Sequence, residues 1–246
     1  MSQKRAAPSV RDFFLDSDSK KIKLDADEKQ TSASPAPKLF GAQPAGKSPI
    51  LVMLPGASGT FTKDFMELLL PRLKERFEVR MRPAGKWKGW SPKTNAQLTV
   101  ETLCPRESDA APWYVMGCSF GNRVAVSVVA DKLTPVAPSL ILTGYPMYGP
   151  NGDEARVEHI KTLPISANVL AISGDKDEFL NKNVPEGKPR GDELWQQVHT
   201  SLACKETTTL RMMPKGGHGV YPSAKGKKHE TTEQIMKWIN EFTSPP

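Results

Sequence analysis

The segment WYVMGCSFGNRVAVSVVADKL, Trp113 to Leu133, joins an apolar run to a stretch with helical spacing through the turn Gly117-Cys118-Ser119-Phe120-Gly121. The pattern Gly-x-Ser-x-Gly is short enough to occur by chance in many loops. Between a strand and a helix, however, it is typical of a sharp turn that exposes the central serine. The surrounding sequence therefore decides whether Ser119 is a candidate nucleophile.

Short apolar runs on both sides of this segment predict a sheet. Strands are expected within residues 50–54, 77–83, 112–117, 139–144, 167–174 and 207–219, and helices within 61–77, 121–133 and 231–242. Pro71 should bend or break the first helix. In the last helix an apolar stripe faces a core, formed by Ile235, Trp238, Ile239 and Phe242. Apolar strands that alternate with helices predict an α/β fold in three layers, with a mostly parallel sheet.

Polar side chains follow three of the predicted strands. Ser119 comes after one strand, Asp175 and Asp177 after a later one, and His218 after the last. Because the carboxyl ends of parallel strands meet at one edge of the sheet, these side chains should lie close together. The chain order Ser, Asp, His is that of an α/β-hydrolase catalytic triad.

The position of each residue in its loop indicates which acid and which histidine would take part in catalysis. Asp177 lies far enough beyond the strand to reach His218, whereas Asp175 is better placed to hold the turn through the backbone. Glu178 is a further neighbouring acid. His218 is flanked by glycines and could act as general base; the alternative is a histidine buried for packing only. Cys118 precedes the nucleophile position and is expected to be a small, core-facing residue.

Main-chain and aromatic groups complete the predicted site. The N–H of Phe120, with that of Ala57 or Ser58, could form an oxyanion hole. Aromatic and apolar residues near strand ends could line a substrate pocket, although packing explains them equally well: Trp87, Trp90, Tyr145, Met147 and Tyr148. No metal or other cofactor is expected.

The composition indicates the class of protein, its compartment and the extent of the folded domain. The 246 residues are 38% hydrophobic and carry a net charge of +7, without a long basic stripe, so the body is not expected to bind nucleic acid. Three cysteines without metal-ligand spacing, no signal peptide and no membrane span predict a soluble intracellular protein. Residues 1–48 are rich in Lys, Asp, Ser, Ala and Pro and predict a disordered tail, leaving 49–246 as the folded domain.

With these motifs the chain resembles, from about Ser48 to Phe242, a compact α/β-hydrolase family related to dienelactone hydrolases. That family includes testis-expressed protein thirty and the hydrolase-like domain of NSL complex subunit three. The resemblance rests on PGASG, GCSFGNRVA, LTGYPMYGP, HIKTLPISANVLAISGDKDEF and MMPKGGHGV. It implies Ser119, Asp177 and His218 as the triad. The family elbow more often has Met or Leu at the position of Phe120 and a glycine at that of Asn122, so Phe120 should narrow the oxyanion site and Asn122 should crowd the helix start.

The chain is too short for the first antiparallel strands of a full hydrolase fold, or for a lid between Thr143 and Val169. A minimal fold and an open site follow. An open site suits a polar or extended acyl substrate, or an acyl group carried by a protein.

The tail contains two short motifs, one that resembles a partner-binding peptide and one that resembles a targeting signal. Val10, Phe13 and Phe14 reproduce the spacing of a PIP box, the peptide that plugs into the sliding clamp PCNA, with Ala7 where glutamine is usual. The cluster formed by Lys20, Lys21 and Lys23 resembles a nuclear-import signal. Both motifs predict a nuclear protein, with the cytoplasm as a second location.

Two functions are consistent with these features. One is a serine hydrolase acting on an ester or thioester. The other is a nuclear interaction protein, recruited to PCNA through its tail, whose hydrolase body is a scaffold with weak or no activity.

Overall fold

The computed structural model describes residues 48–105, 112–149, 152 and 155–244. The clamp-binding motif at Val10, Phe13 and Phe14 and the import motif at Lys20, Lys21 and Lys23 lie outside the described residues. Those expectations, and the domain boundary at residue 48, stay predictions.

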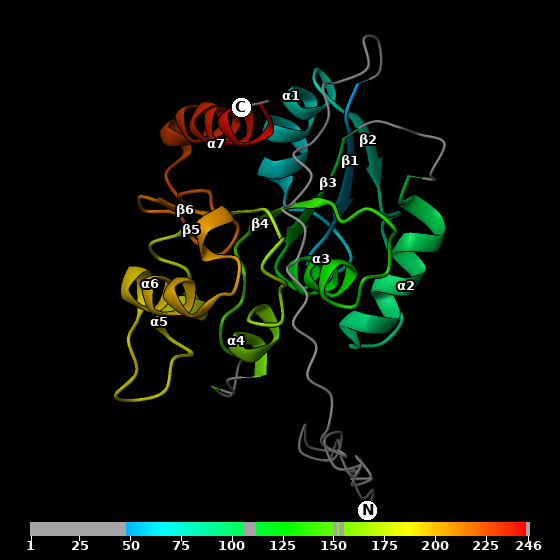
Figure 1. Ribbon diagram of the computed structural model, residues 1–246. Coiled ribbons are helices and arrows are strands. Elements are labelled where there is room, and N and C mark those ends of the chain that lie inside the picture. Colours follow the sequence, from blue (N-terminus) through cyan, green and yellow to red (C-terminus); the bar gives the residue numbers. More distant parts are fainter. Residues whose placement is uncertain (1–47, 106–111, 150–151, 153–154, 245–246) are drawn as a thin grey trace, which may run out of the picture. The chain divides into compact units, whose positions relative to one another are not determined.

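Six parallel strands form one sheet in the order β2-β1-β3-β4-β5-β6 (Figure 1). The strands are β1 (Ile50–Leu54), β2 (Glu78–Met81), β3 (Trp113–Cys118), β4 (Ser139–Thr143), β5 (Val169–Gly174) and β6 (Thr208–Met213). All five neighbouring pairs are parallel. Every strand predicted from the sequence is present, and the predicted α/β fold with a parallel sheet is confirmed.

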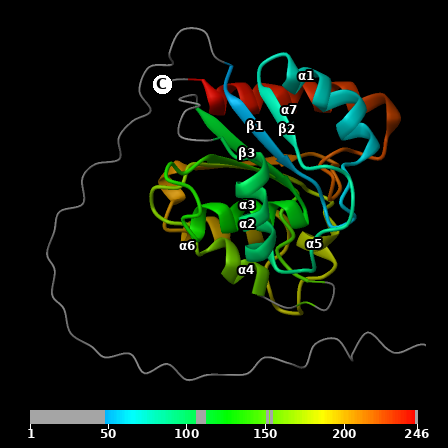
Figure 2. The ribbon, with the colours of Figure 1, turned by 90° about the vertical axis from the view of Figure 1, so that its right-hand side faces the viewer.

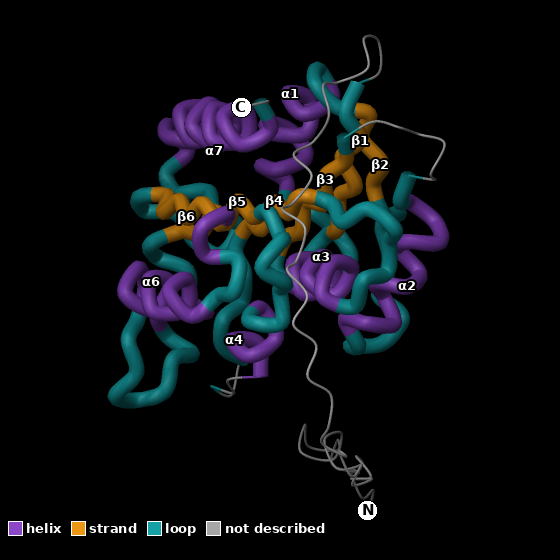
Figure 3. Tube along the Cα trace, in the orientation of Figure 1, coloured by secondary structure: helices purple, strands orange, loops and turns teal. Residues whose placement is uncertain are grey.

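Helices cover both faces of the sheet (Figures 1 and 2). The π-helical turn η2 (Phe65–Leu69), α1 (Leu70–Lys74) and α7 (Lys228–Thr243) pack on one face. The other face carries α2 (Pro92–Leu103), α3 (Phe120–Ala130), α4 (Ala155–Ile160), α5 (Glu178–Asn181) and α6 (Gly191–Ser201). Figure 3 shows this order of helix, sheet and helix layers along the Cα trace.

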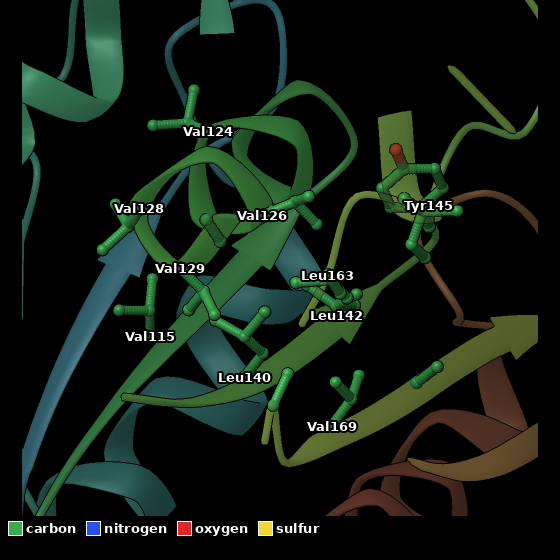
Figure 4. Packing of buried hydrophobic residues seen from close by; sticks show 14 of the residues in the cluster. Val115, Val124, Val126, Val128, Val129, Leu140, Leu142, Tyr145, Leu163 and Val169 are labelled. Atoms are coloured by element: carbon green, nitrogen blue, oxygen red, sulfur yellow. The ribbon is translucent and has the colours of Figure 1, made fainter. Parts of the chain in front are cut away.

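Alternation along β1 divides the core between the two faces. Ile50, Val52 and Leu54 belong to the cluster under α3, and Leu51 and Met53 to the cluster under α7. Since successive side chains of a strand point to opposite faces, a fully apolar strand must be covered on both sides. Figure 4 shows the valines of α3 packed on β3 and β4.

Pro71 alters the first helix as predicted. The segment before it is a π-helical turn, and Pro71 stands in the first turn of α1. Proline lacks the N–H that an α-helix would use there, and a wider turn accommodates this. The turn starts where Thr62 Oγ1 accepts from Phe65 N at 3.3 Å.

Among the described residues, no helix combines the length and apolar character needed to cross a bilayer. Within the same residues, His, Cys, Asp and Glu side chains do not gather in threes or more around a point that could hold a metal ion.

Candidate active site

Ser119 occupies a strained position between β3 and α3. Its backbone angles are φ 51° and ψ −114°, which a residue with a side chain rarely adopts. Ser119 N donates to Thr143 O of β4 at 3.3 Å. Such strain persists only where the surrounding structure imposes it, and it is the conformation of a nucleophile elbow.

Two glycines let the elbow form. A Cβ on Gly121 would overlap the carbonyl oxygen of Leu54 in β1, and one on Gly117 would come within 2.6 Å of the Asn122 backbone. The helix therefore starts directly against the neighbouring strands. Both positions require glycine for space.

Asn122 fastens the elbow to the sheet. It is fully buried, its Nδ2 donates to Thr143 O at 2.8 Å, and its Oδ1 accepts from Thr143 N at 3.1 Å. The sequence comparison with the family suggested crowding at this position. The structure instead shows that the amide joins the start of α3 to the end of β4 through two hydrogen bonds.

Asp177 and His218 lie in direct contact. His218 Nδ1 is 2.9 Å from Asp177 Oδ2 and 3.1 Å from Oδ1. Asp177 is fully buried and also accepts from Phe179 N at 2.9 Å. A buried carboxylate that accepts these bonds fixes the imidazole ring and its tautomer. Of the acids weighed from the sequence, the structure brings Asp177 to the histidine.

The other ring nitrogen of His218 is available for chemistry. Nε2 is buried and has no hydrogen-bond partner among the described residues. The ring lies against Phe179, with centroids 4.3 Å apart, and the histidine side chain is 20% exposed. The loop approaches β4 so closely that a Cβ on Gly144 would overlap His218 O. A histidine held on one nitrogen and free on the other is suited to proton transfer.

Ser119 and His218 line the same cavity, which has a volume of about 210 Å³. Its other walls come from the loop after β1, the start of η2 and the ends of β3 and β4. They are Gly56, Ala57, Ser58, Thr60, Phe61, Thr62, Phe65, Cys118, Thr143 and Gly219. Phe61 and Phe65 stack with centroids 4.8 Å apart. The cavity thus joins an apolar wall to the serine and the histidine.

Two of the three main-chain donors predicted for an oxyanion hole flank this cavity. Ala57 and Ser58 are among its lining residues, and Gly56 lies so close to the elbow that its Cβ would sit 3.5 Å from Ser119 Cβ. Phe120 is the first residue of α3, so its N–H has no carbonyl one turn earlier to donate to. The N–H of Phe120 is therefore not used by an intrahelical hydrogen bond.

The Phe120 side chain points away from the cavity. It is 4% exposed and packs edge-on against Trp87 and Trp90, with centroids 5.2 and 5.6 Å apart. It is not among the residues that line the cavity. The expected narrowing of the oxyanion site by this ring is therefore not seen.

Tyr145, Met147 and Tyr148 lie in the core below α3, and none of them lines the cavity. The sequence predicted that they form the substrate pocket, but in the structure they are buried in the core instead. Tyr145 can be buried because its hydroxyl donates to Arg156 O at 2.9 Å and contacts His159 Nδ1 at 3.2 Å. His159 is part of this internal network, and Ser127 Oγ contacts its Nε2 at 3.1 Å.

Cys118 lines the cavity beside Ser119 but is a poor nucleophile. Burial raises the pKa of its thiol to about 12, and a contact with Thr143 Oγ1 at 2.9 Å offsets this only in part. A protonated thiol does not attack carbonyl groups at neutral pH. This supports the serine as the reacting group at the elbow.

Comparisons with known proteins agree with the fold. Residues 49–244 match the family described as "Alpha/beta hydrolase domain". Three solved structures share the fold: a dienelactone hydrolase from Anabaena variabilis (11% identity, 81% of this chain and 88% of that chain, TM-score 0.53), an alpha-beta serine hydrolase homologue from Coxiella burnetii (12%, 82% and 89%, 0.51), and Est1E from Butyrivibrio proteoclasticus (14%, 82% and 93%, 0.51). No curated protein sequence matches significantly.

The narrower resemblance to testis-expressed protein thirty stays a prediction. The match over residues 49–244 extends from before β1 to the end of α7 and includes every loop of the candidate site. The chain therefore belongs to the alpha/beta hydrolase domain family.

Proposed function

We propose that the protein is a serine hydrolase that cleaves an ester or thioester with a short acyl group. One observation carries the proposal. His218 contacts buried Asp177 through Nδ1, while its buried, unpartnered Nε2 belongs to a ring that lines the same cavity as Ser119. In unliganded enzymes the bond between nucleophile and base often tightens only when substrate binds.

The proposed reaction proceeds in two halves. Ser119 Oγ attacks the carbonyl carbon as its proton passes to His218 Nε2, and Asp177 stabilises the imidazolium. The tetrahedral intermediate collapses when Nε2 returns the proton to the leaving oxygen or sulfur, which leaves an acyl-serine. Water, deprotonated by the same nitrogen, then releases the acid.

The negative charge that develops on the carbonyl oxygen would be held by main-chain donors. The N–H of Phe120 and that of Ala57 or Ser58 would supply them, assisted by the amino-terminal end of α3. Removing one such donor typically costs about 10²-fold or more in kcat.

The size of the cavity supports a short acyl group. Its volume of about 210 Å³ lies below the roughly 300–1,000 Å³ of sites for drug-sized ligands. Phe61 and Phe65 supply an apolar wall and Thr62 a hydroxyl. A long acyl chain would have to leave the cavity and meet solvent.

A fluorophosphonate probe tests the proposal, because it reacts covalently with an activated serine. The purified protein should be labelled, Ser119→Ala should lose labelling, and Ser127→Ala, a buried serine on the same helix, should retain it. Absence of labelling in the wild-type protein, or labelling that persists in Ser119→Ala, would contradict the proposal. Absence of labelling in the wild-type protein would favour the alternative of an inactive scaffold.

A further inference from the structure

The loop between β2 and α2 carries an unusual concentration of positive charge. From Val79 to Val100 the chain has five Lys or Arg residues and no acidic one. We refer to residues 82–93 as the basic-aromatic loop, because they also contain Trp87 and Trp90. This loop has no part in the mechanism above.

Internal contacts hold the loop in one conformation. Arg82 donates to the carbonyl oxygens of Pro83, Gly85 and Lys86, and its guanidinium lies 4.0 Å from the centre of the Trp87 ring. Asn95, 2% exposed, accepts from Lys88 N and contacts three carbonyl oxygens, those of Lys88, Gly89 and Ser91. A loop fixed from within presents its remaining side chains at little entropic cost.

The same contacts bring the loop beside the reaction centre. Trp87 Nε1 donates to Gly56 O at 2.8 Å, and Gly85 N donates to Gly59 O at 3.3 Å. The loop thus packs on the turn that holds the predicted oxyanion donors. Trp90 meets the ring of Phe120, the residue after Ser119.

Three lysine side chains and the exposed face of one tryptophan take no part in these internal contacts. Lys86, Lys88 and Lys93 are exposed, and among the described residues none of the three forms an ion pair or a side-chain hydrogen bond. Trp90 is 69% exposed. Lys93 stands in the first turn of α2, where a cation is unfavourable to the helix. Features that do not stabilise the fold, gathered at a site, point to a ligand.

We infer that the basic-aromatic loop binds the leaving group of the substrate, and that this group is an anion attached to a planar ring. This inference rests on the proposed function. The acyl group would occupy the cavity beside Phe61 and Phe65, and the leaving group would lie over Trp90 with its charge near Lys86, Lys88 and Lys93. The substrate class is a short acyl ester or thioester of an anionic aromatic alcohol or thiol.

The physical basis is separable into two parts. Cations in solvent attract an anion over about 8 to 10 Å at physiological ionic strength, so this contribution weakens with salt. A ring stacked on tryptophan gains a contribution that salt affects little. A charged aromatic group uses both, whereas a neutral ester uses only the second.

A matched pair of esters tests the inference. 2-Naphthyl acetate and 6-sulfo-2-naphthyl acetate share the acyl group and ring and differ in one negative charge. The wild-type protein should prefer the sulfonated ester in kcat/KM by about tenfold at low salt, and the preference should shrink as salt is added. In Lys86→Gln/Lys88→Gln/Lys93→Gln the ratio should fall to about one.

The control variant Lys74→Gln/Lys205→Gln removes cations that precede β2 and β6, at the opposite edge of the sheet from the site. It should keep the wild-type ratio. In Trp90→Ala, binding of both naphthyl groups should weaken, seen as a higher KM for each ester.

Binding of the free leaving group gives a readout that does not need activity. 6-Hydroxy-2-naphthalenesulfonate should bind the wild-type protein more tightly than 2-naphthol by calorimetry, and the triple lysine variant should lose the difference. Equal binding of the two naphthols, or an unchanged ester ratio in the triple variant, overturns the inference. So does an oligonucleotide affinity that the triple variant loses while the ester ratio stays unchanged, because the lysines would then serve a polyanion.

These outcomes separate the inference from the proposed function. Fluorophosphonate labelling of Ser119 without any charge preference leaves the hydrolase standing and removes the leaving-group site. No labelling of the wild-type protein, together with retained naphtholsulfonate binding, removes the hydrolase and leaves a binding site for an aromatic anion without a role in catalysis.

Discussion

At the scale of single residues, the site depends on backbone positions that few side chains could occupy. Ser119 adopts φ 51° because β3, α3 and β4 all end or begin within hydrogen-bonding reach of it. The strain is offset by the contacts of Asn122 with Thr143 and by the space left at Gly117 and Gly121. Substitutions here should therefore affect stability and activity together.

Gly121→Ala should destabilise the protein by about 3 kcal/mol or more, since the new methyl group overlaps the carbonyl oxygen of Leu54 and backbone cannot move aside cheaply. Gly226→Ala is the matched control, because a Cβ there meets nothing within 4 Å. It should change the free energy of unfolding by less than about 1 kcal/mol. Urea unfolding measures both. Similar losses in the two variants would show that space at Gly121 is not limiting.

Asp177→Asn should lower kcat about 10⁴-fold with an intact fold, because an amide favours the wrong tautomer of His218. Asp175→Asn is the comparison: Asp175 precedes the same helix, but in the described part of the chain it forms no hydrogen bond with the histidine ring. It should lose less than about tenfold. Ester hydrolysis with circular dichroism as the folding check decides between them, and equal losses would remove the orienting role from Asp177.

At the scale of elements, α2 is a support for the loop before it more than an amphipathic core helix. Ser91 caps it by accepting from Thr94 N at 3.2 Å, and Pro92 starts it. Its buried residues include the polar Asn95 and Thr99. This mixed face explains why the sequence pattern did not predict the helix. In α6, Leu194, Trp195 and Val198 are buried on one side, and their spacing is the signal by which the sequence indicates this helix.

Asn95→Ala should destabilise the protein by about 2 to 3 kcal/mol, because buried groups of the basic-aromatic loop lose their partners. It should also erase the preference for the anionic ester, since the lysines are no longer held in place. Gln97→Ala, an exposed change on the same helix, should do neither. Chemical unfolding and the ratio of kcat/KM values for the two naphthyl esters test this together. A stable Asn95→Ala variant would mean that the loop is held by other contacts.

At the scale of the whole molecule, one half-buried histidine couples folding to pH. His159 lies between α3 and Tyr145, with Arg123 and Asp131 as the charged groups that act on it. Burial first, and then the positive charge of Arg123, lower its pKa to about 4. The folded protein therefore holds this ring neutral at pH values where the unfolded chain protonates it.

Stability from His159 should be fully present above the unfolded pKa near 6.5 and lost as the pH falls toward 4, by at most about 3 kcal/mol. His159→Gln should flatten this part of the curve, whatever its effect at neutral pH. Urea unfolding of the wild-type protein and of His159→Gln at pH 7.5, 6 and 5 shows how the free energy of unfolding of each protein changes with pH. The remaining histidines are common to both proteins, so parallel curves would exclude His159 as the cause.

The tail carries the remaining prediction of partner and location. The full-length protein should bind the sliding clamp PCNA, and Phe13→Ala/Phe14→Ala should weaken binding at least about tenfold if the two rings are the plug. Phe40→Ala, in the same tail, is the control and should bind as the wild type. Calorimetry with purified clamp measures this, and equal affinity in the double variant would remove the motif.

The sequence by itself determined the sheet and the three residues that meet at its edge. Buried parallel strands are continuous apolar runs, and Ser119, the acidic loop and His218 each follow such a run directly, so their convergence depends on topology alone. Helices whose buried face mixes polar and apolar residues, such as α2, have no such apolar pattern in the sequence.

Only the tertiary structure decided which groups touch. It placed Tyr145 in the core, bonded Asn122 to the end of β4, and laid the basic-aromatic loop on the turn at Gly56. The physical reason is that these contacts join residues far apart in the chain, through side chains and loop paths. No local periodicity encodes them, because each is selected by the packing of the completed fold.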